Sequence, residues 1–381
     1  MYDKNLTFNN DGSFRILCLG DVHENFDIES ETGRAKYLDM LKFHSTAAEM
    51  LKPDLVVYMG DICEVTAEDE DFSKYRAQID RLTKIFTERG IPFATIMGNH
   101  DHDAKLEQPQ MQILESMDMC LTHCKDKNIT GYSNYYYPIY SKDGKAKFNL
   151  WFFDSNNCYP DSEVSKYDIV YPDQIEWYEK TAAKLRDEND GKPLPSIVFQ
   201  HIPVIEEYQL LRKAKPHEMW KAVRGHNKLV NKWFVLKDEN KGYLGEGPCS
   251  PDINCGQFES WKKTGDVKAA FFGHDHMNNI EGKVDGILLA QCKTSAFRAY
   301  TDGARPAVRL ITIDENTQSF DTQVYSFKDF GLKCTCLGPI EQRITDRQSI
   351  NATIAFRAAA AGAAFASICI AGEKIYRLIK K

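Results

Sequence analysis

The chain has 381 residues and a formal net charge of −7, with 43% hydrophobic and 27% charged residues. This length exceeds what a single hydrophobic core usually supports, so we expect one large domain and a smaller additional element. The composition is that of a folded protein and excludes disorder as the main state. Because acidic residues outnumber basic ones, the overall charge gives no basis for binding nucleic acid or an anionic membrane surface. An anionic substrate would need local positive charge, which metal ions can supply.

The N-terminus and the cysteines predict the compartment. Residues 1–4 contain neither the basic nor the apolar segment of a secretory signal, and the eleven cysteines lack the spacing of a small disulfide-rich domain. We therefore expect reduced thiols and a cytoplasmic protein.

Short apolar runs alternate with helical patterns in the first part of the chain. Apolar runs cover residues 14–19, 55–59 and 93–97, and helical spacing of apolar residues covers 37–51 and 72–89. The order strand, helix, strand predicts parallel pairing with right-handed crossovers, and therefore an α/β fold.

The later part of the chain repeats this pattern less regularly. Strands are expected at 148–153, 196–200 and 267–272, a helix at 172–186, and an insertion over the strand ends at 206–252. Further expected elements are a helix at 107–119, an aromatic turn region at 132–140, a short helix at 257–263, and antiparallel strands of a second sheet at 286–291, 308–314 and 321–327.

Five of the expected strands end in polar motifs, which we call tips. The tips read Asp-x-His, Gly-Asp, Gly-Asn-His-Asp, His and Gly-His-x-His in chain order. A lone aspartate after glycine is usually a turn residue, but five such tips at the carboxyl ends of strands favour one shared site. The candidate site residues are Asp21, His23, Asp61, Asn99, His100, Asp101, His201, His274 and His276.

These side chains suit metal ions. Mixed imidazole and carboxylate ligands bind zinc, iron or manganese, whereas calcium and magnesium prefer shells made only of oxygen. With His100 and Asp101 set aside, the seven remaining candidates are too many for one tetrahedral ion but suit two ions that share a carboxylate. Two ions roughly 3.5 to 4 Å apart can clamp the attacking and leaving oxygens of a phosphoryl displacement.

The five tips, in this order, resemble the calcineurin-like metallophosphoesterase superfamily, and the resemblance extends from Phe14 to Asp314. The segments around Phe153-Asp154-Ser155 and Gln200-His201-Ile202-Pro203 are similar to the purple-acid-phosphatase-like branch that includes the cell-cycle-regulator phosphatases. The resemblance implies a metallo-dependent phosphatase fold: a four-layer α/β sandwich with two mixed β-sheets flanked by helices, and metals at the strand ends.

The resemblance also implies roles for the tips. His100 would be a catalytic histidine that binds no metal, and Asp101 would orient its ring. A hydroxide bridging the two ions would be the nucleophile, and no covalent intermediate is expected. The implied ligands are Asp21, His23, Asp61 and His276 for one ion, and Asp61, Asn99, His201 and His274 for the other.

Three residues raise separate questions. True purple acid phosphatases have a tyrosine three residues after the Gly-Asp aspartate, whereas this chain has Glu64 there, so a tyrosine-to-iron colour is not expected and the metal pair stays open among manganese, iron and zinc. We expect His102 to be exposed or to face the substrate, with a supporting role behind the metal ligands as an equal alternative. Asp154 either has such a supporting role or caps its strand.

The last part of the chain differs in composition. We expect a phosphoesterase domain at 1–330 and a C-terminal extension at 331–381 that carries an Ala-rich helix. The uncharged stretch at 358–372 is shorter than the roughly 20 residues that span a bilayer. The favoured interpretation is a helix packed on the domain or on a partner through residues 354–372, with membrane association as the weaker alternative. Cys334-x-Cys336 has no second pair, which disfavours a zinc site.

The leading hypothesis is a dinuclear metal-dependent phosphoesterase that hydrolyses phosphate monoesters, with a small molecule or a phosphoprotein as substrate and no nucleic acid partner. A phosphodiesterase, for example for cyclic nucleotides, is the alternative, since the same metal core serves both reactions. Loops at 102–147 and 206–252 would decide between them. A non-catalytic scaffold is disfavoured because every tip is intact.

Overall fold

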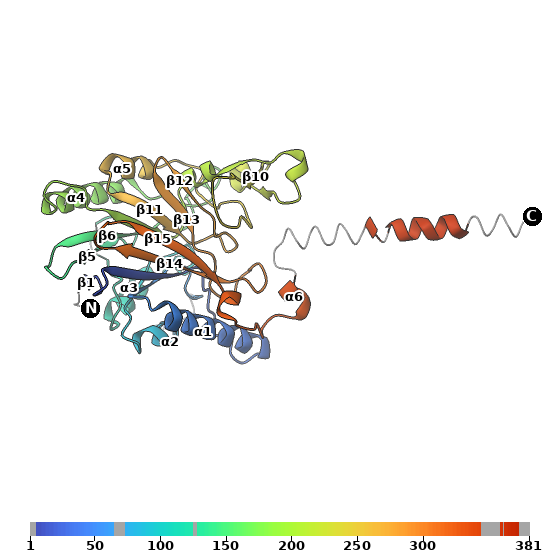
Figure 1. The fold of residues 1–381 in the computed structure, drawn as a ribbon, viewed down its shortest axis with the longest axis horizontal. Coiled ribbons are helices and arrows are strands. Elements are labelled where there is room, and N and C mark those ends of the chain that lie inside the picture. The colour runs from blue at the N-terminus through green and yellow to red at the C-terminus, as the bar shows by residue number, and fades with distance from the viewer. Residues whose placement is uncertain (1–4, 65–72, 125–127, 344–358, 361, 373–381) are drawn as a thin grey trace, which may run out of the picture.

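Two β-sheets lie face to face, with helices covering their outer sides (Figure 1). The computed structural model describes residues 5–64, 73–124, 128–343, 359–360 and 362–372. From the bottom of the view in Figure 1, helices α1 (Glu31–Leu51) and α2 (Ser73–Thr87), the two sheets, and helices α4 (Pro172–Glu188) and α5 (Gln257–Thr264) follow one another.

The first sheet contains the three strands whose parallel order was predicted from the alternation of strands and helices. These strands run parallel, with α1 and α2 as the connections between them, and two later strands extend the sheet in antiparallel orientation. The spatial order is β15 (Phe320–Ser326), β14 (Ala307–Asp314), β2 (Ser13–Leu19), β3 (Leu55–Tyr58) and β4 (Phe93–Thr95).

The second sheet is also mixed. Its four central strands, β6, β7, β11 and β13, are parallel, whereas β5 pairs antiparallel with β6, and β12 pairs antiparallel with β13. The short edge strand β1 pairs parallel with β5. The spatial order is β1 (Leu6–Thr7), β5 (Tyr135–Tyr140), β6 (Ala146–Phe153), β7 (Ser196–Gln200), β11 (Val267–Phe272), β13 (Ile287–Gln291) and β12 (Glu281–Val284).

The side chains of β2 show how the layers are held together. Ile16 and Cys18 point into the core between the two sheets, where they join Phe152 and Phe199 of the second sheet. Leu17 and Leu19 point the other way, into the core under α1 and α2. Since successive side chains of a strand face opposite sides, one apolar run supplies two cores. The predicted four-layer α/β sandwich is confirmed.

The predicted insertion contains a small sheet of its own. Its three strands are antiparallel and are joined by single 3-10 turns. These elements are η1 (Ile205–Leu210), β8 (Leu211–Lys213), η2 (Pro216–Glu218), β9 (Val223–Arg224), η3 (Asn227–Leu229) and β10 (Trp233–Leu236). The remaining elements are α3 (Glu107–Ser116), η4 (Phe327–Phe330) and α6 (Pro339–Arg343).

Two predictions about elements are wrong. The aromatic turn region at 132–140 is largely strand β5, in which buried Tyr135 stacks on Phe152 of β6 with ring centroids 4.3 Å apart. Aromatic side chains favour strands when such a neighbour is available, which the local sequence does not reveal. The strand expected at 286–291 also joins the seven-stranded sheet as β13, parallel to β11, and does not belong with β14 and β15.

The C-terminal extension first folds back on α1 and then leaves the domain. The buried Asp39 carboxylate of α1 accepts hydrogen bonds from the backbone amides of Thr335 (2.6 Å) and Cys336 (3.0 Å). Residues 359–360 and 362–372 are helical with exposed side chains, Phe365 among them at 70% exposure, so this part of the predicted helix does not pack on the domain. Residues 344–358 lie outside the described residues. No described helix is long and apolar enough to cross a membrane.

Candidate metal centre

The two sheets bring all five tips together at one edge. Because β2, β3 and β4 are parallel in one sheet, and β7 and β11 are parallel in the other, their carboxyl ends lie side by side. The tips continue directly from these strands: Asp21 and His23 follow β2, Asp61 follows β3, Asn99 follows β4, His201 follows β7, and His274 and His276 follow β11.

The backbone at the tips is bent into conformations that few residues adopt. Asp21, His23, Asp61 and His274 all have positive φ, at 39°, 47°, 50° and 72°. Such a residue other than glycine costs about 1 to 3 kcal/mol, and these conformations gather at functional sites. Gly98 is required for a related reason, because a Cβ atom there would lie 2.2 Å from Oδ1 of Asp61. The tips of β3 and β4 therefore touch.

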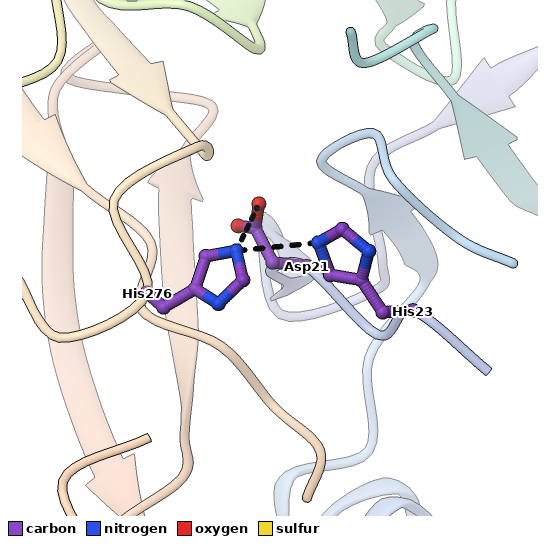
Figure 2. Close-up of side chains that lie close together, drawn as sticks. All are labelled: Asp21, His23 and His276. Carbon is purple, nitrogen blue, oxygen red and sulfur yellow. Dashed lines mark hydrogen bonds and ion pairs between the residues drawn. The ribbon is translucent and has the colours of Figure 1, made fainter. Parts of the chain in front are cut away.

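One group of candidate ligands consists of Asp21, His23 and His276. Their side chains converge from opposite sides, as Figure 2 shows, with the two imidazole Nε2 atoms 3.2 Å apart. Nε2 of His276 lies 3.7 Å from Oδ1 of Asp21. All three residues are buried and could hold one metal ion.

The second group consists of Asp61, His201 and His274. Nε2 of His201 lies 3.2 Å from Oδ2 of Asp61 and 3.1 Å from Oδ1 of Asn99. The same Asp61 oxygen lies 3.4 Å from Nε2 of His23, which belongs to the first group. Asp61 thus stands between the groups, where a carboxylate shared by two ions would have to be.

The hydrogen bonds around the histidines fit metal ligation. Nδ1 of His201 donates to the Met59 carbonyl (2.7 Å), and Nδ1 of His276 donates to the Tyr300 carbonyl (3.1 Å). These bonds leave the lone pair of each Nε2 atom facing inward, as in metal-binding histidines. Nε2 of His274 is buried and has no hydrogen-bond partner among the described residues. A cation would satisfy all of these nitrogens.

Burial also keeps two of these imidazoles neutral, as metal ligands must be. It lowers the pKa of His276 to about 3 and that of His274 well below its ordinary value. Burial alone would raise the pKa of Asp61, but the His201 charge and hydrogen bond outweigh it and lower that pKa well below the usual range. The centre therefore combines an ionised carboxylate at Asp61 with neutral imidazoles at His274 and His276, whereas at His201 burial is outweighed by the nearby Asp61, which raises the pKa of His201 to about 10.

His100 stands beside the ligands and faces solvent. Its ring centroid is 5.1 Å from that of His23, its backbone amide donates to Oδ1 of Asp61 (2.9 Å), and its side chain is 53% exposed. The ring is held by Asp103, whose Oδ2 lies 2.6 Å from Nδ1. This position suits a group that meets a bound substrate without binding metal.

The predicted role of Asp101 in orienting His100 is wrong. Oδ2 of Asp101 turns back and accepts hydrogen bonds from the backbone amides of Gly98 and Asp61, both at 2.8 Å. The carboxylate thereby fixes the tips of β3 and β4 against each other. Asp103, two residues later, takes the predicted role, and its spacing of three residues from His100 is the only signal that the sequence offered.

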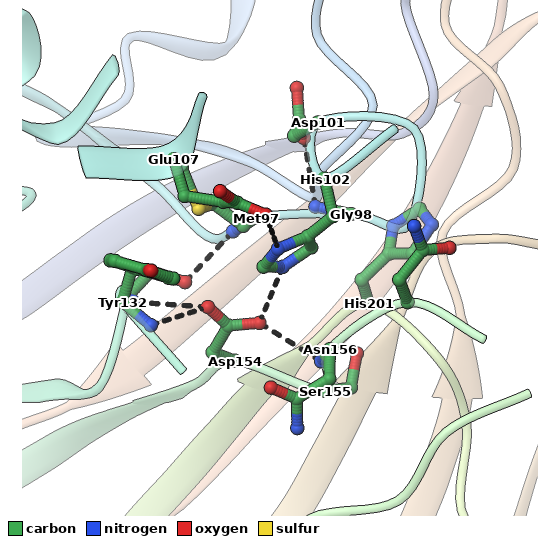
Figure 3. Close-up of polar contacts among 12 residues, drawn as sticks. Met97, Gly98, Asp101, His102, Glu107, Tyr132, Asp154, Ser155, Asn156 and His201 are labelled. Carbon is green, nitrogen blue, oxygen red and sulfur yellow. Dashed lines mark hydrogen bonds and ion pairs between the residues drawn. The ribbon is translucent and has the colours of Figure 1, made fainter. Parts of the chain in front are cut away.

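His102 is buried, not exposed, and its contacts fit the supporting role that was the alternative interpretation. Figure 3 shows its ring between two carboxylates: Nδ1 lies 3.1 Å from Oε1 of Glu107, and Nε2 lies 3.0 Å from Oδ1 of Asp154. Burial by itself would lower the pKa of His102, but the charges of Asp154 and Glu107 raise it to about 11. Asp154 also accepts from the amides of Tyr132 and Ser133, which precede β5. It therefore ties both that segment and, through His102, the segment after β4 to the end of β6.

A third cluster lies away from this centre. Asp39, Cys334 and Cys336 are close enough to hold a metal ion, with the two sulfurs 3.6 Å apart. The Asp39 oxygens already accept three hydrogen bonds, from the Thr335 and Cys336 amides and the Thr335 hydroxyl. Docking of the extension on α1 accounts for the position of Asp39, and the expectation that these cysteines bind no zinc stays a prediction.

The sequence profile of the family described as Calcineurin-like phosphoesterase matches residues 14–278, a range that contains every candidate ligand. The chain belongs to this family. A relative from Arabidopsis thaliana, named probable inactive purple acid phosphatase 14, is 28% identical over 323 residues, which cover 78% of this chain and 74% of that protein. Phosphatase DCR2 of Saccharomyces cerevisiae is 25% identical over 296 residues, 71% of this chain and 45% of that protein. The resemblance to purple-acid-phosphatase-like proteins is confirmed.

Proposed function

We propose that this phosphoesterase-family protein is an active enzyme that hydrolyses phosphate monoesters with two metal ions. The observation that supports the proposal best is the position of Asp61 between two groups of buried candidate ligands. One ion would be held by Asp21, His23, Asp61 and His276, and the other by Asp61, Asn99, His201 and His274. Imidazole and carboxylate ligands suit manganese, iron or zinc.

Bound ions would supply a hydroxide nucleophile and neutralise charge on the phosphoryl group. The protein's own contribution is proton transfer and positioning. Since Nδ1 of His100 is bonded to Asp103, its Nε2 is the atom available to donate a proton to the leaving oxygen. Asp101 and His102 act indirectly, because they hold the segment that carries Asn99 and His100.

A non-catalytic role is the second candidate function, because the Arabidopsis relative is named a probable inactive phosphatase. Loss of catalysis in such a fold is expected to remove metal ligands or the catalytic histidine. The described site retains a full set of both, which favours activity. A phosphodiesterase remains the alternative within enzymes, since the same metal core would serve it.

The reaction is tested with purified protein supplied with manganese, iron or zinc and offered phenyl phosphate or bis(phenyl) phosphate. We expect metal-dependent hydrolysis of the monoester at the higher rate, and metal analysis of the most active preparation identifies the ions. Asp61→Asn should abolish the activity. Asp80→Asn, on the exposed face of α2, is the matched control. Equal activity in the Asp61→Asn protein would refute the site, and faster hydrolysis of the bis-ester would establish the diesterase alternative.

The proposal extends to compartment and partners. We infer a cytoplasmic protein that acts on a phosphorylated small molecule or phosphoprotein, and buried cysteines such as Cys18, Cys249 and Cys292, which are thiols, support a reducing environment. The exposed helical residues 362–372 support a partner contact through residues 354–372, with a membrane surface as the alternative.

A further inference from the structure

A large cavity adjoins the candidate metal centre on the side of the insertion. It has a volume of about 920 Å³ and is lined by the β9 to β10 region of the insertion, by residues 245–247, and by Met277 and Tyr300. Met277 follows His276 directly, and the Tyr300 ring stacks on the His276 ring with centroids 4.2 Å apart. One wall of the cavity therefore lies directly beside His276, a candidate ligand of the first group.

The wall nearest the metal centre is fixed by Glu246. Its carboxylate accepts hydrogen bonds from the Met277 amide and from the Tyr300 hydroxyl, both at 2.8 Å. Tyr300 is 53% exposed although one ring face lies on His276, and Trp233, also in the lining, is 42% exposed. Two aromatic side chains thus offer surfaces on which a ring of a ligand can lie.

The cavity lining also contains two basic side chains that are not paired with the Glu246 carboxylate. Lys166 and Arg224 line it, and among the described residues neither forms a salt bridge. Arg224 donates from Nε to the Val230 carbonyl (2.6 Å), which orients the guanidinium and leaves its terminal nitrogens for a ligand. Nζ of Lys166 lies 4.9 Å from the Tyr167 ring centroid, and that ring meets the His274 ring edge-on at 4.3 Å. The lysine is thereby held near the second ligand group.

We propose that this cavity receives the leaving group of the substrate, and that the substrate is a small organic bisphosphate with a ring, such as a nucleoside or sugar bisphosphate. The inference rests on the proposed function, since one phosphate must lie at the metal centre. The ring lies against Tyr300 and Trp233, and the second phosphate meets Lys166 and Arg224. Guanidinium groups bind phosphate strongly because their nitrogens match its oxygens in pairs.

The size of the cavity favours a small molecule over a phosphoprotein. Pockets for small molecules are about 300 to 1,000 Å³, and this volume lies within that range. A phosphorylated side chain on a protein would fill only part of the cavity. Lys166 and Arg224 would then have no second phosphate of the substrate to bind.

The test compares matched substrate pairs: AMP with adenosine 3′,5′-bisphosphate, and fructose 6-phosphate with fructose 1,6-bisphosphate. For the metal-loaded protein we expect kcat/KM about tenfold higher for the bisphosphate of at least one pair, and the two pairs distinguish a nucleoside from a sugar. In a Lys166→Met/Arg224→Met protein, the ratio of kcat/KM for the bisphosphate to kcat/KM for the monophosphate should fall about tenfold. Lys184→Met, which removes a positive charge from α4 outside the cavity, should leave the ratio unchanged.

Three results would overturn the inference. The first is a ratio near one for both pairs in the unaltered protein. The second is an equal loss for monophosphates and bisphosphates in the double variant. The third is a phosphopeptide hydrolysed with higher kcat/KM than every small molecule.

Failure of the proposed function is recognised separately, by the absence of phenyl phosphate hydrolysis with every metal. In that case, calorimetric binding of the two bisphosphates to the metal-loaded protein decides the inference. About tenfold weaker binding to the double variant would support it, and equal binding would reject it.

Discussion

Nε2 of His102 lies 3.0 Å from Oδ1 of Asp154, although the two residues are 52 positions apart and follow strands of different sheets. Both side chains are buried, and Glu107 approaches the opposite ring nitrogen. We predict that Asp154→Ala destabilises the protein by about 3 kcal/mol, because it leaves a buried imidazolium short of a partner. Urea unfolding measures the loss.

The same substitution should weaken metal binding, because Asp154 helps to hold the segment that carries Asn99. Metal retained after dialysis reports this effect. Asp80→Ala on the exposed face of α2 should change neither quantity by more than about 0.5 kcal/mol. If Asp154→Ala were as stable as the unaltered protein, the buried ion pair would have no structural role.

Asp103 and Asp101 should give different defects when altered. Asp103→Asn weakens the group that holds the His100 ring, so we expect kcat to fall about tenfold, with a shifted pH profile and little change in thermal stability. Asp101→Ala removes the acceptor for the Gly98 and Asp61 amides, so we expect lower stability and weaker metal binding. Activity profiles and melting curves of both variants check this. The reverse pattern would restore Asp101 as the orienting residue.

Removal of metal should lower the melting temperature. Candidate ligand nitrogens such as Nε2 of His23 and Nε2 of His276 lie only 3.2 Å apart, so a bound cation would hold them together. A ligand present at about 1,000 times its dissociation constant stabilises the folded state by about 4 kcal/mol. Scanning calorimetry before and after chelation measures the change, and added manganese, iron or zinc should reverse it. Asp61→Asn should reduce the response, and an undiminished response would place the ions elsewhere.

His44 predicts a loss of stability in acid. Burial lowers the pKa of this imidazole from 6.5 to about 4, and its Nε2 atom donates to the Ser295 carbonyl. In the unfolded chain the ring takes up a proton near pH 6.5, whereas the folded ring resists it until about pH 4. Stability from this group is therefore present above pH 6.5 and is lost as pH falls toward 4.

At pH 5 the loss from His44 amounts to about 2 kcal/mol relative to neutral pH. His44→Gln keeps a donor for the Ser295 carbonyl but does not titrate, so its stability should fall less between pH 7.5 and pH 5. Urea unfolding at both pH values gives the difference. An identical decline in both proteins would mean that His44 does not contribute to acid sensitivity.

Asp39 should control how firmly the C-terminal extension is attached. Its carboxylate accepts three hydrogen bonds from Thr335 and Cys336, and loss of these bonds in Asp39→Ala should cost about 2 kcal/mol. We expect faster proteolysis within residues 332–343 and unchanged cleavage elsewhere. Glu49→Ala, at an exposed position on the same helix, is the control. Cleavage at the normal rate would show that apolar packing alone holds the extension.

Much of the centre could be predicted because its residues follow strands with strong patterns. Apolar runs such as 14–19 and 55–59 can only be buried strands in this context, and parallel strands place Asp21 and Asp61 at the same edge. The five tips therefore converge without any tertiary detail. The family resemblance added the division of ligands between two ions, which remains a prediction.

The side-chain contacts could not be predicted in the same way. Asp101 and Asp103 both stand near His100 in the sequence, and the turn after Gly98 decides which carboxylate faces the ring. The basic lining of the cavity was also missed, because Lys166 lies in a loop and Arg224 in a strand of only two residues, which are too short to show a periodic pattern. Such contacts depend on how loops pack, and a local sequence does not specify that packing.

The candidate ligands also couple metal uptake to the order of folding. His23 and His276 are 253 positions apart and approach each other only when the two sheets have docked. A growing or partly unfolded chain presents scattered histidines and carboxylates that cannot act together. The protein would therefore acquire its ions late in its own assembly, and any event that separates the sheets would release them.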